Sequence, residues 1–172
     1  MLRSLTLSLL ILTLAGPAAA ETRYLAYDAA DRITQALTRG VTLEVERGLF
    51  GAISVRRVIS TSRRGSAGIH RGGPDAVRQA LPDNATETNV YSIATEGDGR
   101  GLARALCPGA DEAWLVTGRV RLVRPLIVQA VGRWPDGTLR HCVQLSYVWR
   151  GEWAAPPPQS TVDEAAPPAG PR

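Results

Sequence analysis

The sequence predicts one small α+β domain with a mainly antiparallel sheet of about five to six strands, three short helices and one disulfide. Runs of segments that alternate apolar and polar residues indicate the strands, and shorter segments of helical pattern interrupt them. The chain of 172 residues, 44% hydrophobic and 21% charged, has the composition and length of a single globular domain.

The first 20 residues have the layout of a secretory signal peptide. A positive charge at Arg3 precedes an apolar run over 5–14, and small residues end at Ala20. The apolar run is shorter than the roughly 20 residues that a membrane-spanning helix needs. We therefore expect cleavage after Ala20, export to a bacterial periplasm, and no membrane span in the mature form.

The first half of the mature chain begins with a predicted helix over 28–40, capped by Asp28 and ended by glycine. Alternation of apolar and polar residues then predicts strands over 41–46 and 52–59, joined as a hairpin. Residues 60–73 are rich in Ser, Gly and Arg and predict a loop.

The second half continues with short elements. We expect helices over 74–81 and 102–107 and strands over 90–95, 113–123, 126–134 and 138–149. The last two strands flank a Pro-Asp-Gly turn and form a hairpin. Together, residues 21–153 are predicted to form the domain, and the Pro/Ala-rich segment 154–172 a disordered tail.

The two cysteines are expected to pair. Cys107 and Cys142 are too far apart for a redox motif, and an exported protein with an even number of cysteines most simply forms a disulfide. Closing a loop of about 35 residues in this way stabilises a small domain by roughly 3–4 kcal/mol. Reactive thiols remain the alternative.

Several kinds of chemistry are excluded or weakly supported. All 20 basic residues are Arg, so there is no lysine for a Schiff base or a phosphate-binding P-loop. The Gly-rich turn 97–101 has Leu102 where a dinucleotide-binding motif needs glycine. The only histidines are His70 and His141, too few for a recognisable metal site. We expect no metal, no cofactor and no assigned catalytic residue.

Arginines are distributed unevenly. Residues 47–74 contain six arginines and no acid, and the last strands are basic again. Alternation would place some of these guanidinium groups on one sheet face, where their planar donors suit phosphate or carboxylate groups. The candidate anion- or partner-binding residues are Arg56, Arg57, Arg63, Arg64, Arg71, Arg119, Arg121 and Arg140. A merely solvated basic face is the alternative.

These observations favour a non-catalytic binding module of the cell envelope, in which an Arg-rich loop and sheet face contact an anionic glycolipid or glycan, or an acidic envelope protein. Nucleic acid is not expected, because export argues against it and only 5% of residues are aromatic. A small periplasmic hydrolase using His141 is one alternative. Another is a structural subunit of an envelope complex that presents Tyr147, Trp149 and Trp153.

Overall fold

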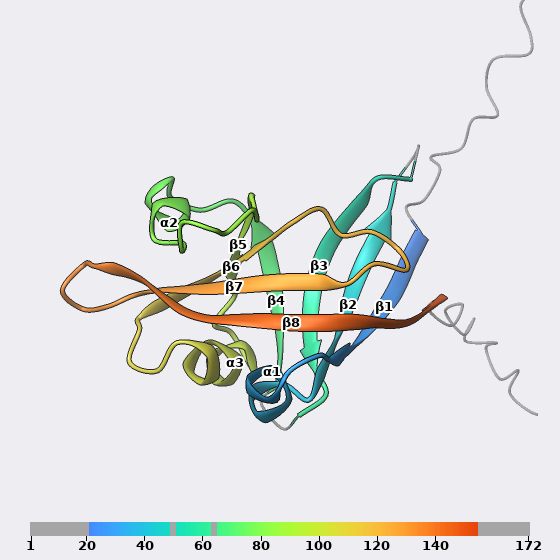
Figure 1. The fold of residues 1–172 in the computed structure, drawn as a ribbon, viewed down its shortest axis with the longest axis horizontal. Helices are drawn as coiled ribbons and strands as arrows, with labels where there is room; N and C mark the ends of the chain where they lie inside the picture. The colour runs from blue at the N-terminus through green and yellow to red at the C-terminus, as the bar shows by residue number, and fades with distance from the viewer. Residues whose placement is uncertain (1–20, 49–50, 63–64, 155–172) are drawn as a thin grey trace, which may run out of the picture.

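The chain folds as a closed antiparallel β-barrel in a computed structural model, which describes residues 21–48, 51–62 and 65–154. Each strand pairs with the next in sequence, and the last pairs with the first (Figure 1). The strands are β1 (Glu21–Ala29), β2 (Gly40–Arg47), β3 (Ile53–Ser60), β4 (Ser66–Arg71), β5 (Asn89–Ile93), β6 (Glu112–Thr117), β7 (Leu126–Arg133) and β8 (Leu139–Ala154).

The predicted α+β class with five to six strands is therefore wrong. Residues 21–29 and 66–71, neither of which was expected to form a strand, become β1 and β4. In β4 the inward residues Ala67 and Ile69 alternate with Ser, Gly and His. With only two apolar residues, this short strand resembles a loop in the sequence. With both strands present, the sheet has no open edge among the described residues, and helices do not form a layer against it.

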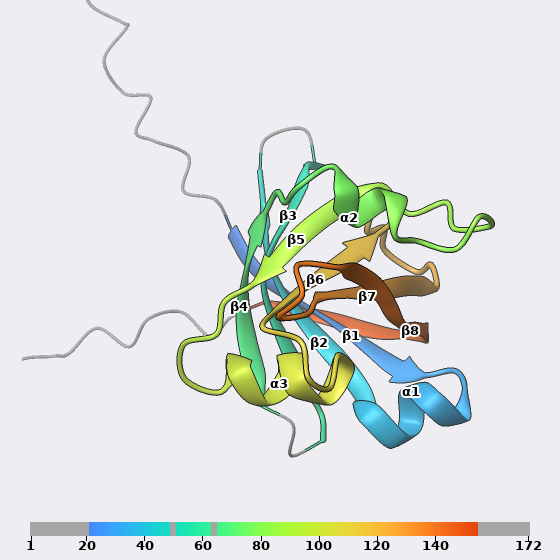
Figure 2. The same cartoon turned by 90° about the vertical axis from the view of Figure 1, so that its left-hand side faces the viewer.

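Three short helices lie in the connections between strands. They are α1 (Arg32–Leu37), α2 (Ala76–Gln79) and α3 (Gly99–Leu106). Figures 1 and 2 both show α1 and α3 at the same end of the barrel, whereas α2 lies in the β4–β5 connection, away from them. The first helix begins later than predicted, because Asp28 and Ala29 continue β1 and Asp31 provides the N-cap.

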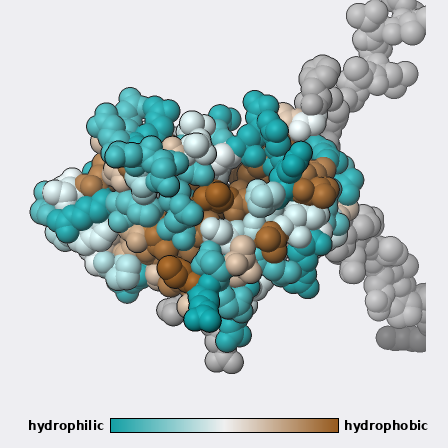
Figure 3. Space-filling view, viewed as in Figure 1, coloured by the Kyte–Doolittle hydropathy of each residue, from teal (hydrophilic) through white to brown (hydrophobic). Residues whose placement is uncertain are grey.

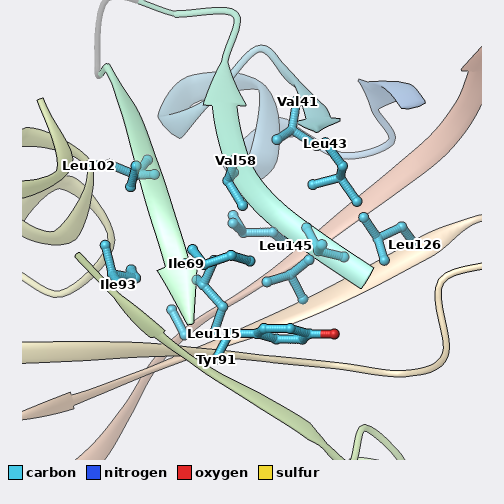
Figure 4. Packing of buried hydrophobic residues seen from close by; sticks show 14 of the residues in the cluster. Val41, Leu43, Val58, Ile69, Tyr91, Ile93, Leu102, Leu115, Leu126 and Leu145 are labelled. Atoms are coloured by element: carbon cyan, nitrogen blue, oxygen red, sulfur yellow. The ribbon is translucent and has the colours of Figure 1, made fainter. Parts of the chain in front are cut away.

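Apolar side chains fill the barrel interior. Alternate residues of the strands point inward, and side chains of α3 join them at the helical end (Figure 4). Leu25 and Ala130 are fully buried there, and Leu102 of α3 is 1% exposed. A second, smaller cluster lies outside the barrel, where Val77 of α2 packs with Trp114, Val116 and Val131. The barrel interior is thus a packed core, and α2 covers part of the outer surface of the barrel.

Hydroxyl groups close the helical end of the barrel. The Asp31 carboxylate accepts hydrogen bonds from the Thr34 backbone N–H and hydroxyl, both at 2.8 Å. The Thr34 hydroxyl accepts a bond from the backbone of Ser146 on β8 at 2.9 Å. The Thr38 hydroxyl lies 3.0 Å from that of Tyr147. These bonds hold α1 and the residue that follows it against β8, and each of these side chains has a hydrogen-bond partner.

The predicted disulfide between Cys107 and Cys142 is confirmed, with the two Cα atoms 5.3 Å apart. The β7–β8 register shifts between Ala130 and Val131, leaving Cys142 as the extra residue of a bulge. The bulge turns Cys142 toward Cys107, at the end of α3, and reverses the alternation on either side of it. His141 consequently lies on the outer face with Val131, not on the inner face with Val143 as the uninterrupted pattern predicted.

Removing the disulfide should lower stability without changing the fold. Replacing Cys107 and Cys142 together by alanine opens a loop of 35 residues, and we expect a loss of roughly 3–4 kcal/mol in the free energy of unfolding. Urea denaturation of the oxidised protein and the double variant measures this difference. Equal denaturation midpoints would contradict the structural role, as would two titratable thiols in the oxidised wild type.

High pH should destabilise the barrel through its buried tyrosines. Burial raises the pKa of Tyr147 to about 12, above the usual value of 10.0, and raises that of Tyr27 as well. The unfolded chain therefore ionises first, and stability present below pH 10 falls between about pH 10 and 12, by roughly 2–3 kcal/mol for Tyr147. Unfolding measured at several pH values should show a smaller loss in Tyr147→Phe. Tyr24→Phe, on the outer surface, should keep the wild-type loss.

Candidate functional site

A hollow of about 580 Å³ lies at the barrel end opposite α1 and α3. Residues of the β2–β3 and β6–β7 connections border it, together with the end of β4 and the start of β5. Both connections lie in the upper part of Figure 1. Its volume is in the range of small-molecule sites. The hollow, called here the barrel mouth, is lined by Arg47, Gly51, Ala52, Ile53, Arg71, Asn89, Tyr91, Arg119, Val120, Arg121 and Leu122.

Four arginines line the barrel mouth, and no described carboxylate does. Arg47 and Arg71 are the last residues of β2 and β4, so both strands deliver a guanidinium to the same end. Arg119 and Arg121 lie in the β6–β7 connection, 118–125. A concave surface of one charge sign concentrates the electrostatic potential and attracts ions of the opposite sign.

The four guanidinium groups differ in their partners. Arg47 lies 3.8 Å from Glu152, and Arg71 donates to the Asn89 side-chain oxygen at 3.4 Å. Arg119 and Arg121 are exposed and form no ion pair with any carboxylate of the described ranges. Their N–H groups face solvent and can donate to the oxygens of an incoming anion without breaking an existing ion pair.

The floor of the barrel mouth is apolar. Tyr91 of β5 and Val120 line both the mouth and an internal cavity of about 30 Å³. The residues around that cavity are almost all aliphatic, and Leu43, Ile69 and Leu145 are among them. Burial raises the pKa of Tyr91, while the nearby Arg71 guanidinium partly opposes the shift. The tyrosine hydroxyl is therefore a neutral hydrogen-bond donor at the boundary between the two spaces.

The structure separates the arginines that the sequence grouped together. Only Arg71, Arg119 and Arg121 of the predicted set reach the barrel mouth. Arg56 and Arg57 lie on the outer wall, where β2 supplies Glu46 at 2.6 Å and Glu44 at 3.7 Å as their respective partners. Arg63 and Arg64 lie outside the described residues.

The predicted guanidinium array on one sheet face does not form. The strand expected over 113–123 ends at Thr117, so Arg119 and Arg121 belong to a loop. Arg140 lies in the β7–β8 hairpin, where it forms an ion pair with Asp136 at 2.8 Å and its guanidinium carbon lies 5.2 Å from the centre of the Trp134 ring. Arg47 was absent from the candidate set, although its place at the end of an alternating strand could have indicated it.

His141 forms part of a separate polar cluster outside the barrel. Its Nε2 lies 2.8 Å from the Gln129 side-chain oxygen, and the Gln129 amide donates to Glu87 at 3.2 Å and to Gln144 at 3.0 Å. Burial lowers the pKa of His141. Among the described residues no Ser, Thr or Cys side chain is hydrogen-bonded to this imidazole, so the geometry offers it no nucleophile to activate.

The exposed apolar residues do not form one continuous face in the view of Figure 3. The hydrophobic patches in that view are separated by polar side chains. Ile127 on β7 is 40% exposed and Val148 on β8 is 47% exposed. Tyr147, one of three residues expected to present an apolar surface, is 3% exposed and belongs to the core. Trp153 is exposed and stacks on Tyr24 with ring centroids 6.1 Å apart.

The described part of the chain lacks two features that would indicate other functions. It contains no group of three or more His, Cys, Asp or Glu placed to hold a metal ion. None of its helices is long and apolar enough to cross a membrane. Comparison of the chain with known protein families, characterised proteins and solved structures gave no match.

The His141 cluster should affect stability at acidic pH. Because its folded-state pKa is lowered from 6.5, the imidazole stays neutral in the barrel while the unfolded chain takes up a proton. The stability present above pH 6.5 should therefore decline as the pH falls below this value. Unfolding of His141→Gln, which retains a side-chain hydrogen-bonding group, should show a smaller decline. His70→Gln, on β4, should follow the wild type; identical profiles for all three proteins would contradict the assignment.

Proposed function

We propose that the protein is an exported, non-catalytic binding module that holds an anionic group at the barrel mouth. The four arginines around one hollow, three of them without an ion-pair partner among the described residues, are the observation that carries the proposal. Guanidinium groups bind phosphate and carboxylate oxygens through paired, planar donors. The ligand class is therefore a phosphate- or carboxylate-bearing molecule, such as the headgroup of an envelope glycolipid or part of an acidic glycan.

Concavity favours a small ligand group over an acidic protein surface. The mouth occupies the end of a closed barrel, and its lining comes from strand ends of β2 to β5 and from the β2–β3 and β6–β7 connections. A group that enters such a hollow can meet several guanidinium groups at once, and its charge is partly shielded from water. A flat acidic surface would meet mainly the rim.

Export is part of this proposal and is supported by the disulfide. The bond between Cys107 and Cys142 suits an oxidising compartment such as the periplasm. The predicted signal peptide, residues 1–20, lies outside the described residues, as do residues 155–172 of the predicted disordered tail. Envelope phosphates and acidic glycans would be available to a protein in that compartment.

Arginine replacement in the barrel mouth should abolish most anion binding. We expect pyrophosphate, titrated by calorimetry, to bind the wild type and to bind Arg119→Ala/Arg121→Ala at least about tenfold more weakly, because two charge-assisted contacts are lost. Affinity in the wild type should also fall as salt is added.

Arg56→Ala/Arg57→Ala is the matched control. It removes the same charge from the outer wall, where both arginines already have carboxylate partners, and it should bind pyrophosphate as the wild type does. Equal weakening in both double variants would show only nonspecific attraction. Binding of polyglutamate without any binding of pyrophosphate would instead favour an acidic protein partner and overturn the proposal.

A further inference from the structure

The arginine-lined mouth and the apolar interior are adjacent spaces. Tyr91 and Val120 line both of them, so these side chains form the boundary. Tyr91 projects from β5, whereas Val120 belongs to the β6–β7 connection and points into the barrel from a loop. Val120 is 9% exposed, and it is the loop residue that covers the cavity from the side of the mouth.

We propose that the ligand of the mouth is an amphiphilic anion, whose charged group contacts the arginines while a short alkyl group passes Val120 into the barrel. This inference rests on the proposed anion-binding function and specifies its ligand. The shared chemistry is a phosphate or carboxylate joined directly to an alkyl chain. Arginines at a rim and aliphatic residues beyond it are complementary to the two ends of such a molecule.

The cavity limits the alkyl group to a small size. Its volume of about 30 Å³ leaves room for a methyl- to ethyl-sized group, and the lining is aliphatic except for Thr38, Thr117 and two tyrosines. A mainly apolar cavity gains from an apolar occupant, because the surrounding side chains then make additional van der Waals contacts. Longer chains require Val120 to move.

The loop that carries Val120 has an unfavourable backbone conformation nearby. Val123 has a φ of 57°, in the left-handed region that a β-branched residue rarely adopts. Its side chain is 73% exposed, so packing of that side chain does not offset the free-energy cost of this backbone conformation. Such strain is common at binding sites, where surrounding structure holds it in place. A rearrangement of the 118–125 loop that moves Val120 could also relieve Val123.

Tyr91 supplies a polar contact at the point where the charged group of the ligand joins its alkyl chain. Its ring belongs to the interior cluster, and its side chain is close enough to Arg71 for the guanidinium to influence it. None of the other described residues forms a hydrogen bond with its hydroxyl. The hydroxyl can therefore donate to an oxygen of the charged group while the ring contacts the first carbons of the chain.

Chain-length dependence tests this inference. Alkyl phosphates from methyl to octyl, and a parallel series of alkyl carboxylates from acetate to decanoate, can be titrated into the ¹⁵N-labelled oxidised protein and followed by NMR. We expect the affinity of the wild type to rise by up to about fourfold per methylene for the first one or two carbons, and then to level off. Comparing the two series shows which charged group the mouth prefers.

Variants of Val120 should move the point at which affinity levels off. Val120→Ala enlarges the entrance and should extend the rise to longer chains, whereas Val120→Leu should shorten it. Val148→Ala is the matched control, since it makes the same chemical change at an exposed position on β8, outside the 118–125 loop. It should retain the wild-type dependence.

The outcomes separate this inference from the proposed function. Equal affinity for all chain lengths, with arginine dependence intact, would overturn the amphiphilic ligand and leave anion binding standing. A chain-length effect that is unchanged in both Val120 variants would place the alkyl group elsewhere and also overturn it. Failure of pyrophosphate and every alkyl anion to bind would overturn both proposals.

Discussion

Pairing of β8 with β1 is the constraint on which the rest of the structure depends. The first half of β8 pairs with β7 and its second half with β1, so this one strand of 16 residues closes the barrel. Register shifts in the β1–β8, β2–β3 and β7–β8 ladders introduce the local bends and twist that closure requires. Without closure, β1 would lose one of its two neighbours and the aliphatic interior would open to water.

Closure also restricts where a ligand can bind. Every strand has a paired neighbour on each side among the described residues, so only parts of strands, such as the first half of β8 on its β1 side, offer an unpaired edge to a partner peptide. The interior is packed except for the small cavity, and α1 and α3 with their hydroxyl network occupy one end. The opposite end is where the β2–β3 and β6–β7 connections, four arginines and the cavity boundary come together.

The sequence allowed correct prediction of features that depend on neighbouring residues. The β7–β8 hairpin about Pro135, Asp136 and Gly137 is confirmed, because alternation and turn chemistry are local signals. The disulfide, between residues 35 apart in sequence, is confirmed for another reason, since two cysteines allow only one pairing within the chain. The fold class was wrong because closure is a contact between the two ends of the domain, which no local pattern contains. The face of His141 was misassigned because a bulge at Cys142 shifts the alternation by one residue, and bulges leave little trace in sequence.

The candidate site was only partly predictable for a related physical reason. Arginines on the barrel wall face a neighbouring strand, and the antiparallel register places Glu44 directly opposite Arg57. Cross-strand pairing thus neutralises the wall locally, although the sequence alone shows a run of arginines without acids. Arg119 and Arg121 follow the last paired residue of β6, where no opposing strand supplies a carboxylate. The charge that remains available for a ligand is therefore determined by strand register, not by the density of arginine along the chain.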